Sequence, residues 1–383
     1  MNFNFLLPTR IIMEPGLRQR VGKHLNDHGI KKVLIVTDPG IQRSGLLDSI
    51  YVSLKAEGID YRETADIKPN PRSEDCNRIA EAYKHEGLQG LLAVGGGSAI
   101  DAAKAISLLL THDGRIEDYE GECGLQRDIL PIIAVPTTAG TGSEVTIFSV
   151  ITDSQRRYKM SLIDPRLAPK LALLDTEVTA TLPPAIAAAT GMDALTHAIE
   201  AYTGRRANPI SDGLALHAIS LINEHLVPAV EEPDNQNARE QMLIASLIAG
   251  VAFGNADVAS VHCISEAIGG MYDTPHGVAN SIFLPFIFRH NRDANLPRHA
   301  QVGYALGVEP TLSHAEAAEA AVQRLQALSQ RLGIPRFRDV AGVNEADFQV
   351  IAEKSKINMS DSSNAKEMTV DGYLQVIRQA YDH

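Results

Sequence analysis

Four short runs of apolar residues constrain the fold of the first half of the chain most strongly. They cover 32–38, 91–94, 130–136 and 171–175, and three of them run into a turn or a loop rich in Gly or Thr. Each run is apolar at successive positions, which is the pattern of strands buried on both faces. Segments with helical periodicity lie between them at 74–86 and 99–110. The first half is therefore predicted to be an α/β domain with a parallel sheet and helices on both faces.

The pattern changes after the double proline at 183–184. The second half has few candidate strands and carries alanine-rich stretches with helical spacing, separated by Gly, Pro, Asn and Asp. The expected helices cover 185–203, 211–227, 236–252, 258–269, 315–332, 346–356 and 370–381. A chain of 383 residues is long enough for two domains. We expect an α/β domain over 1–182 and an all-α domain over 183–383.

The composition argues against several kinds of partner. There are 35 Lys and Arg against 47 Asp and Glu, giving a net charge of −12. Nucleic acids and anionic membranes both favour a basic face, so neither is expected as the main partner. The apolar stretches at 91–94, 105–110 and 242–253 are short for crossing a bilayer, and the N-terminus lacks the cationic start of a signal peptide. Three widely spaced cysteines fit reduced thiols, so we expect a soluble cytoplasmic protein.

Three glycines at 95–97 separate an expected strand from an expected helix. Glycines permit close backbone approach, and the first turn of a helix favours a phosphate group. Ser98 is placed to cap this helix, and Asp101, three residues later, to complete a variant of the capping box. The segment is a candidate phosphate loop, although a tight turn that binds nothing remains an alternative.

Two further polar segments follow expected strands. The loop at 136–146 contains four threonines, a serine and two glycines, and open α/β sheets bind ligands at the carboxyl ends of their strands. Asp38 ends an earlier strand, where an acid accepts hydrogen bonds from a ribose diol and repels a 2′-phosphate. These features predict a ligand site that accepts a ribose diol and disfavours a 2′-phosphate, although an Asp at the end of a strand often only starts a turn.

One carboxylate and three histidines in the second half form a candidate metal site. Asp193 and His197 lie four residues apart on one face of an expected helix. His262 lies on another expected helix, and His276 follows Pro275. Such a set would satisfy Zn²⁺ or Fe²⁺. The Asp–His spacing also arises by chance in a chain with 13 His and 47 acids, so ordinary core or surface histidines remain an alternative.

Taken together, these segments resemble the iron-containing (group III) alcohol dehydrogenases along nearly the whole chain. The most specific matches are 191–202 and 272–280, supported by 5–11, 68–71, 95–104 and 136–146. The resemblance implies a dinucleotide-binding α/β domain, a helical metal domain and an active site in the cleft between them. It also implies a dimer or larger homo-oligomer.

The resemblance assigns roles to individual residues. The implied metal ligands are Asp193, His197, His262 and His276. The implied cofactor contacts are Asp38, Asn70, Gly96, Gly97, Ser98, Thr137, Thr138 and Thr141, with Lys159 near the nicotinamide ribose. The implied activity is that of an NAD(H)-linked alcohol dehydrogenase or aldehyde reductase acting on a small alcohol or aldehyde. In it, Fe²⁺ or Zn²⁺ polarises the substrate oxygen during hydride transfer.

Three positions depart from the family pattern. Glu266 stands where members often place a histidine close to the nicotinamide, Asp257 where a small residue is common, and Asn364-Ala365 where Asn-Pro is frequent. Helical spacing puts Glu266 one turn after His262. It is therefore a candidate catalytic proton relay or a partner that orients His262, with a solvated or salt-bridged helix residue as the alternative.

Two other classes of function remain open from the sequence. One is an NAD- and metal-dependent lyase of the dehydroquinate synthase type, without net redox. The other is a non-catalytic nucleotide-binding protein. The 136–146 loop and the spacing of Asp193 and His197 fit the dehydrogenases better.

Overall fold

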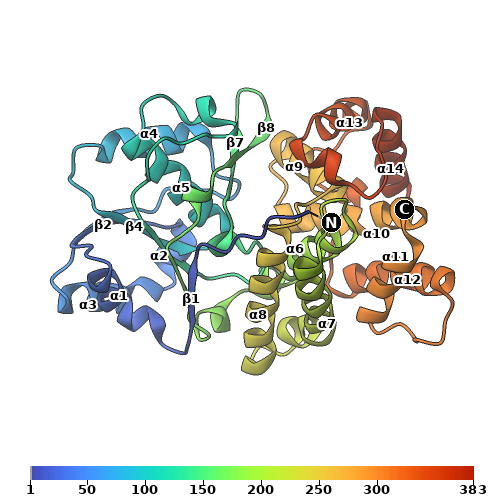
Figure 1. Cartoon of the computed structure of the whole chain (residues 1–383), viewed down its shortest axis with the longest axis horizontal. Helices are drawn as coiled ribbons and strands as arrows, with labels where there is room; N and C mark the ends of the chain where they lie inside the picture. The colour runs from blue at the N-terminus through green and yellow to red at the C-terminus, as the bar shows by residue number, and fades with distance from the viewer. Residues whose placement is uncertain (1) are drawn as a thin grey trace. The chain divides into compact units, whose positions relative to one another are not determined.

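The computed structural model describes residues 2–383, which form two compact units. The sheet unit comprises 7–138 and 143–182. The helical unit comprises 183–383 together with 139–142 and the residues up to Leu6. Figure 1 shows the strands in the blue and green part of the chain and the long helices in the part coloured from yellow-green to red.

The sheet unit contains a parallel sheet of six strands in the order β1-β9-β6-β4-β2-β3. The strands are β1 (Arg10–Met13), β2 (Lys32–Val36), β3 (Asp60–Thr64), β4 (Gly90–Gly95), β6 (Ile132–Pro136) and β9 (Leu171–Leu174). The helices are α1 (Val21–Asp27), α2 (Pro39–Arg43), α3 (Leu46–Ala56), α4 (Ser73–Tyr83) and α5 (Gly97–Thr111). The predicted fold class is confirmed, since a mostly helical region follows this sheet.

Both faces of the central strands are buried, which explains why β2, β4 and β6 are apolar at nearly every position. Val33 and Ile35 of β2 belong to one core cluster, which includes residues of α1 and α3. Leu34 and Val36 belong to a second cluster, which includes residues of α4 and α5. Figure 1 shows α1 and α3 on one side of β2 and β4, and α4 and α5 on the other. Successive side chains of a strand point to opposite faces, so each face needs its own apolar set.

A second, smaller sheet was not expected from the sequence. It orders its strands β5-β8-β7, with β5 (Gly121–Glu122), β7 (Phe148–Asp153) and β8 (Tyr158–Ile163). β7 and β8 form an antiparallel pair. Their serines, threonine and lysine interrupt the apolar pattern, so no continuous apolar run marks them. Lys159 lies on β8 opposite Thr152, and both side chains are buried.

The helical unit contains nine α-helices along residues 183–383. They are α6 (Pro184–Thr203), α7 (Pro209–Glu231), α8 (Gln236–Phe253), α9 (Ser260–Tyr272), α10 (His276–Asn291), α11 (Leu296–Ala305), α12 (His314–Arg331), α13 (Phe348–Lys356) and α14 (Val370–Asp382). Seven correspond to the expected segments. α10 and α11 were not expected, and α10 is buried along most of its length with Pro285 inside it, so it shows no apolar stripe.

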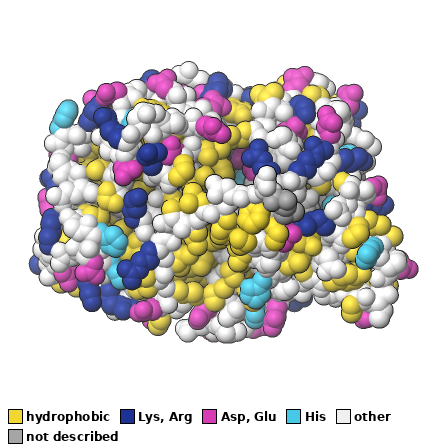
Figure 2. Space-filling view, viewed as in Figure 1, with side chains coloured by type: hydrophobic (Ala, Val, Ile, Leu, Met, Phe, Trp, Pro, Cys, Tyr) yellow, Lys and Arg dark blue, Asp and Glu magenta, His cyan; other side chains and the backbone are white. Residues whose placement is uncertain are grey.

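One helix among residues 2–383, α7, is long and apolar enough to cross a membrane by length and composition alone. Core helices of soluble proteins pass the same test, so one such helix is weak evidence for a membrane-spanning segment. α7 packs against α6 and α8 within the helical unit. On the face shown in Figure 2, Lys and Arg side chains are interspersed with Asp and Glu.

Candidate metal centre and cofactor-binding edge

The four residues expected as metal ligands come together within the helical unit. Asp193 and His197 lie one turn apart on α6, His262 lies on α9, and His276 is the first residue of α10. One ligand atom from each of the four lies within 4.8 Å of the others. Asp193 Oδ1 is 3.9 Å from His197 Nδ1, 3.9 Å from His262 Nε2 and 3.7 Å from His276 Nε2.

The close approach of α10 to α6 depends on a glycine beside the last ligand. A Cβ atom on Gly277 would lie 2.2 Å from the carbonyl oxygen of Ala189 on α6. Any larger residue would push the start of α10 away from α6. Gly277 therefore lets His276 reach Asp193.

Burial and neighbouring charge set the protonation of the histidines. Burial, followed by the neighbouring His262, lowers the pKa of His197 well below its usual value. Burial also opposes protonation of His262, but the hydrogen bond and charge of Glu200 outweigh it and raise its pKa. A neutral His197 keeps a lone pair for an electrophile, as a metal ligand must.

The cluster fits a divalent cation. Within residues 2–383, His197 Nδ1 is buried and has no hydrogen-bond partner. The ring stacks on Phe253, with centroids 4.2 Å apart, which holds it in place. A buried polar nitrogen is normally satisfied, and three imidazole nitrogens with one carboxylate suit Fe²⁺ or Zn²⁺.

Glu200 is a functional residue that the sequence reasoning missed. Its Oε2 accepts from His262 Nδ1 at 2.6 Å and from the backbone N–H of Ala259 at 2.8 Å. Its Oε1 accepts from the backbone N–H of Val261 at 2.7 Å. The bond to Nδ1 leaves Nε2 of His262 as the ligand atom. The spacing 193, 197 and 200 places Glu200 on the ligand face of α6, and that spacing was the available signal.

Glu266 is buried on α9, one turn after His262, with 8% of its surface exposed. Its Oε2 accepts from Asn358 Nδ2 at 2.6 Å. The partner that orients His262 through Nδ1 is Glu200 rather than Glu266. Burial excludes the solvated form of the alternative for Glu266.

The other two departures from the family pattern contact the same segment as Glu266. Asp257, whose φ is +66°, accepts hydrogen bonds from Ser360 and Ser363. Asn364 exchanges amide hydrogen bonds with Asn291 at the end of α10. All three departures therefore make hydrogen bonds to or from 358–364, which includes the short helix η9 (Met359–Ser363).

In the sheet unit, six of the expected cofactor residues follow the carboxyl ends of β2, β4 and β6: Asp38, Gly96, Gly97, Ser98, Thr137 and Thr138. Asp38 follows β2 and caps α2, because its Oδ1 accepts from Gly40 N at 2.7 Å and Ile41 N at 3.0 Å. A Cβ on Gly96 would lie 3.1 Å from Thr138 Oγ1, so the loops after β4 and β6 touch. Gly95 has φ +155°, a conformation that favours glycine. This edge of a parallel sheet is where nucleotides bind.

The expected capping role of Ser98 is wrong. Gly96 is the N-cap of α5 and makes no side-chain cap, while Ser98 lies inside the first turn. Asp101 completes no capping box, and its carboxylate accepts from Ser143 Oγ at 2.5 Å and Val150 N at 3.1 Å. The first turn therefore has no capping side chain, which suits a phosphate.

Lys104 of α5 makes hydrogen bonds to the loop after β6. It is fully buried, and its Nζ donates to Ser143 Oγ at 2.9 Å, Thr146 O at 3.0 Å and Phe148 O at 2.6 Å. Burial lowers its pKa to about 8 and raises that of the buried Glu144 to about 7. This buried network holds the threonine-rich loop in shape.

The remaining expected cofactor residues are spread over both units. Asn70 is buried with φ +52°, and Thr137 is buried at the end of β6. Thr141 belongs to 139–142, which packs with the helical unit. In that segment, a Cβ on Gly140 would lie 2.7 Å from Thr190 Cβ on α6.

Comparison with known proteins gives matches over nearly the whole chain. Residues 8–176 match the family model for iron-containing alcohol dehydrogenase, and 187–381 match the C-terminal model of the Fe-containing alcohol dehydrogenase family. The NAD-dependent methanol dehydrogenase of Bacillus methanolicus is 38% identical over 378 residues, covering 98% of this chain and 99% of that protein. The 1,3-propanediol dehydrogenase of Citrobacter freundii is 37% identical over 382 residues, covering 99% of each. A crystal structure of 1,3-propanediol oxidoreductase superimposes with a TM-score of 0.95 at 37% identity, covering 99% of this chain and 100% of that one.

Proposed function

The chain belongs to the iron-containing alcohol dehydrogenase family, and from this we propose that it is an NAD(H)-linked, metal-dependent oxidoreductase interconverting a small alcohol and its aldehyde. The observation that carries the proposal is the gathering of Asp193, His197, His262 and His276 around one point. When bound, the ion, Fe²⁺ in this family, supplies a Lewis acid for the substrate oxygen, and the nicotinamide supplies or accepts the hydride.

Residues of this chain would prepare the metal site before any substrate arrives. Glu200 holds the proton of His262 on Nδ1, so that Nε2 faces the cluster. Phe253 stacks on His197 and limits rotation of that ring. Together they fix the directions of two ligands, so less ordering remains when the ion binds.

We propose that NAD(H) is held by the cofactor residues named above, six of which follow the carboxyl ends of β2, β4 and β6. The full set is Asp38, Asn70, Gly96, Gly97, Ser98, Thr137, Thr138, Thr141 and Lys159. The first turn of α5 would receive a phosphate group. Asp38 has Oδ1 committed to α2, which leaves Oδ2 for the ribose diol. A carboxylate there disfavours a 2′-phosphate and so favours NAD(H).

Glu266 is proposed as the proton relay of the reaction. It is buried one helical turn from His262, and the amide of Asn358 holds its carboxylate. A positioned carboxylate near a reacting oxygen is a common proton carrier. It also adds negative charge to the site, which disfavours anionic substrates.

The proposal extends to the domains, the oligomeric state and the location of the protein. We propose two functional domains, 1–182 for the dinucleotide and 183–383 for metal and substrate, in a cytoplasmic homodimer or larger homo-oligomer. The excess of 47 Asp and Glu over 35 Lys and Arg supports the proposal that neither nucleic acid nor an anionic membrane is the main partner. The lyase alternative has no support in the comparisons, since the related proteins are dehydrogenases.

The test is reconstitution of metal-free protein with Fe²⁺ or Zn²⁺, followed by NADH formation with a panel of small alcohols. We expect activity to return with the ion and to be lost in His262→Asn. His299→Asn is the matched control, because His299 is also a buried histidine of the helical unit but lies outside the cluster. Full activity in the metal-stripped protein would overturn the proposal.

A further inference from the structure

Asn280 lies among the atoms that would hold the ion. It is fully buried on α10, one turn after His276. Its Nδ2 is 2.6 Å from Asp193 Oδ1, 3.1 Å from His262 Nε2 and 3.2 Å from His276 Nε2. One amide nitrogen therefore lies within hydrogen-bond distance of three of the four candidate ligand atoms.

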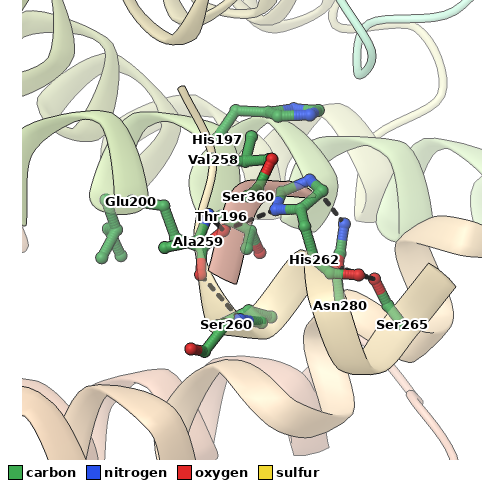
Figure 3. Close-up of polar contacts among 12 residues, drawn as sticks. Thr196, His197, Glu200, Val258, Ala259, Ser260, His262, Ser265, Asn280 and Ser360 are labelled. Atoms are coloured by element: carbon green, nitrogen blue, oxygen red, sulfur yellow. Dashed lines mark hydrogen bonds and ion pairs between the residues drawn. The ribbon is translucent and has the colours of Figure 1, made fainter. Parts of the chain in front are cut away.

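The orientation of this amide is fixed from the other side (Figure 3). Its Oδ1 accepts a hydrogen bond from Ser265 Oγ, and Ser265 lies on α9 three residues after His262. Since a carboxylate oxygen only accepts, the nitrogen must be the atom that faces Asp193. Glu200 accepts from Nδ1 of His262, so in the neutral ring Nε2 is also an acceptor.

The amide and an ion would use the same electron pairs. An imidazole nitrogen has a single lone pair, which either accepts a hydrogen bond or binds a metal. The contacts of 2.6–3.2 Å to Asn280 are hydrogen-bond distances, whereas metal–ligand bonds are about 2.0–2.2 Å. The two arrangements therefore exclude each other at His262 and His276.

We propose that Asn280 is a positioning residue that takes the place of the cation in the metal-free protein, and that the ion displaces its amide from both imidazoles. A hydrogen bond to a buried carboxylate offsets part of the cost of removing it from water, and Asp193 is only 2% exposed. Donation from Asn280 offsets that cost and holds the ligand set together until the ion arrives. This inference rests on the proposed metal-dependent function.

The test compares Zn²⁺ binding by the wild-type protein and Asn280→Ala, using competition with a chelator. One of the two amide hydrogens faces Asp193, and the imidazoles of His262 and His276 share the other. That shared hydrogen bond no longer competes with the ion in the variant, so we expect about tenfold tighter Zn²⁺ binding. We also expect the melting temperature of the metal-free form to fall by more than that of the loaded form. An amide that instead orients Asp193 in the loaded site predicts weaker binding, and weaker or unchanged binding would overturn the inference.

Two further variants keep the result interpretable. Asn291→Ala removes another buried amide of α10, which is paired with Asn364, and should lower both melting temperatures equally with no change in Zn²⁺ affinity. Ser265→Ala releases the amide without removing it, so a smaller increase in affinity is expected even if Asn280→Ala does not fold. If the wild-type protein binds no ion, the proposed function fails. If it binds and Asn280→Ala does not bind more tightly, only this inference fails; Ser265→Ala decides in the same way where Asn280→Ala does not fold.

Discussion

Replacement of Glu200 by Gln tests the link between the helix that bears His262 and the metal site. The carboxylate accepts three hydrogen bonds, from the backbone N–H groups of Ala259 and Val261 and from His262 Nδ1. Glutamine has one acceptor oxygen and one amide donor. If its oxygen faces His262, its NH₂ meets the N–H of Val261. In the other orientation NH₂ meets His262 and favours the tautomer whose Nε2 carries the proton.

The size of the effect follows from these contacts. A buried N–H left without an acceptor costs about 1–3 kcal/mol. For a unit of about 200 residues this lowers the melting temperature by about 2–12 °C. Loss of a carboxylate that orients a ligand histidine weakens metal binding by about 10–100-fold. We expect the loss of stability and the loss of metal affinity together, because Glu200 holds both the start of α9 and the His262 ring.

The assay is chelator competition for Zn²⁺ combined with thermal unfolding of the metal-free and loaded forms. Glu144→Gln is the matched control, since Glu144 is also a buried glutamate but lies in the sheet unit. It should leave the Zn²⁺ affinity unchanged. The reasoning is refuted if Glu200→Gln binds Zn²⁺ as tightly as the wild-type protein does.

Three other predictions address the cofactor, the proton path and pH. Asp38→Ser removes a charge but keeps an oxygen to cap α2, so kcat/KM with NADPH relative to NADH should rise at least about tenfold; an unchanged ratio contradicts the role of Asp38. Glu266→Gln keeps an acceptor for Asn358 and should remove one limb of the pH–rate profile at normal metal content, whereas an unaltered profile excludes a relay. Burial raises the pKa of Glu144 from its ordinary value of 4.5 to about 7. The protonated side chain therefore stabilises the fold fully below pH 4.5, and this stabilisation is lost as the pH rises to 7. Glu144→Gln should therefore gain up to about 3 kcal/mol relative to wild type between pH 4.5 and 7; a constant difference in denaturant unfolding over that range would contradict this.

The parts of the fold that the sequence predicted are those in which burial leaves a repetitive mark. Strands β2, β4 and β6 are apolar at successive positions because each lies between two cores, and all four residues of β9 are buried as well. The amphipathic helices α12 and α14 were expected for a similar reason, since one face of each is buried and the other exposed. α10 was missed because it is buried on nearly every side, which removes the periodicity that identifies a helix.

The candidate site also contains residues that the sequence predicted and residues that only the structure reveals. The four ligand types were named from spacing and from the resemblance, and the structure brings them together. Asn280 is 87 positions from Asp193 in sequence, and only the packing of α10 on α6 brings the two together. Glu200 was available from its position on the ligand face of α6, but its role depends on contacts with 259–262 that spacing alone does not show.

The three departures from the family pattern, at 257, 266 and 364–365, are connected through the segment 358–364. Their effects on the protein therefore depend on one another. Their hydrogen-bonded pairs are Glu266 with Asn358, Asp257 with Ser360 and Ser363, and Asn364 with Asn291. Residues in contact couple energetically, so the effects of changing them singly do not add. Restoring a histidine at 266 alone would remove the carboxylate and also leave the buried amide of Asn358 without its acceptor. A change in substrate preference after that single replacement could therefore arise from the lost charge or from displacement of 358–364. Exchanging Glu266 together with 358–364 separates the two effects.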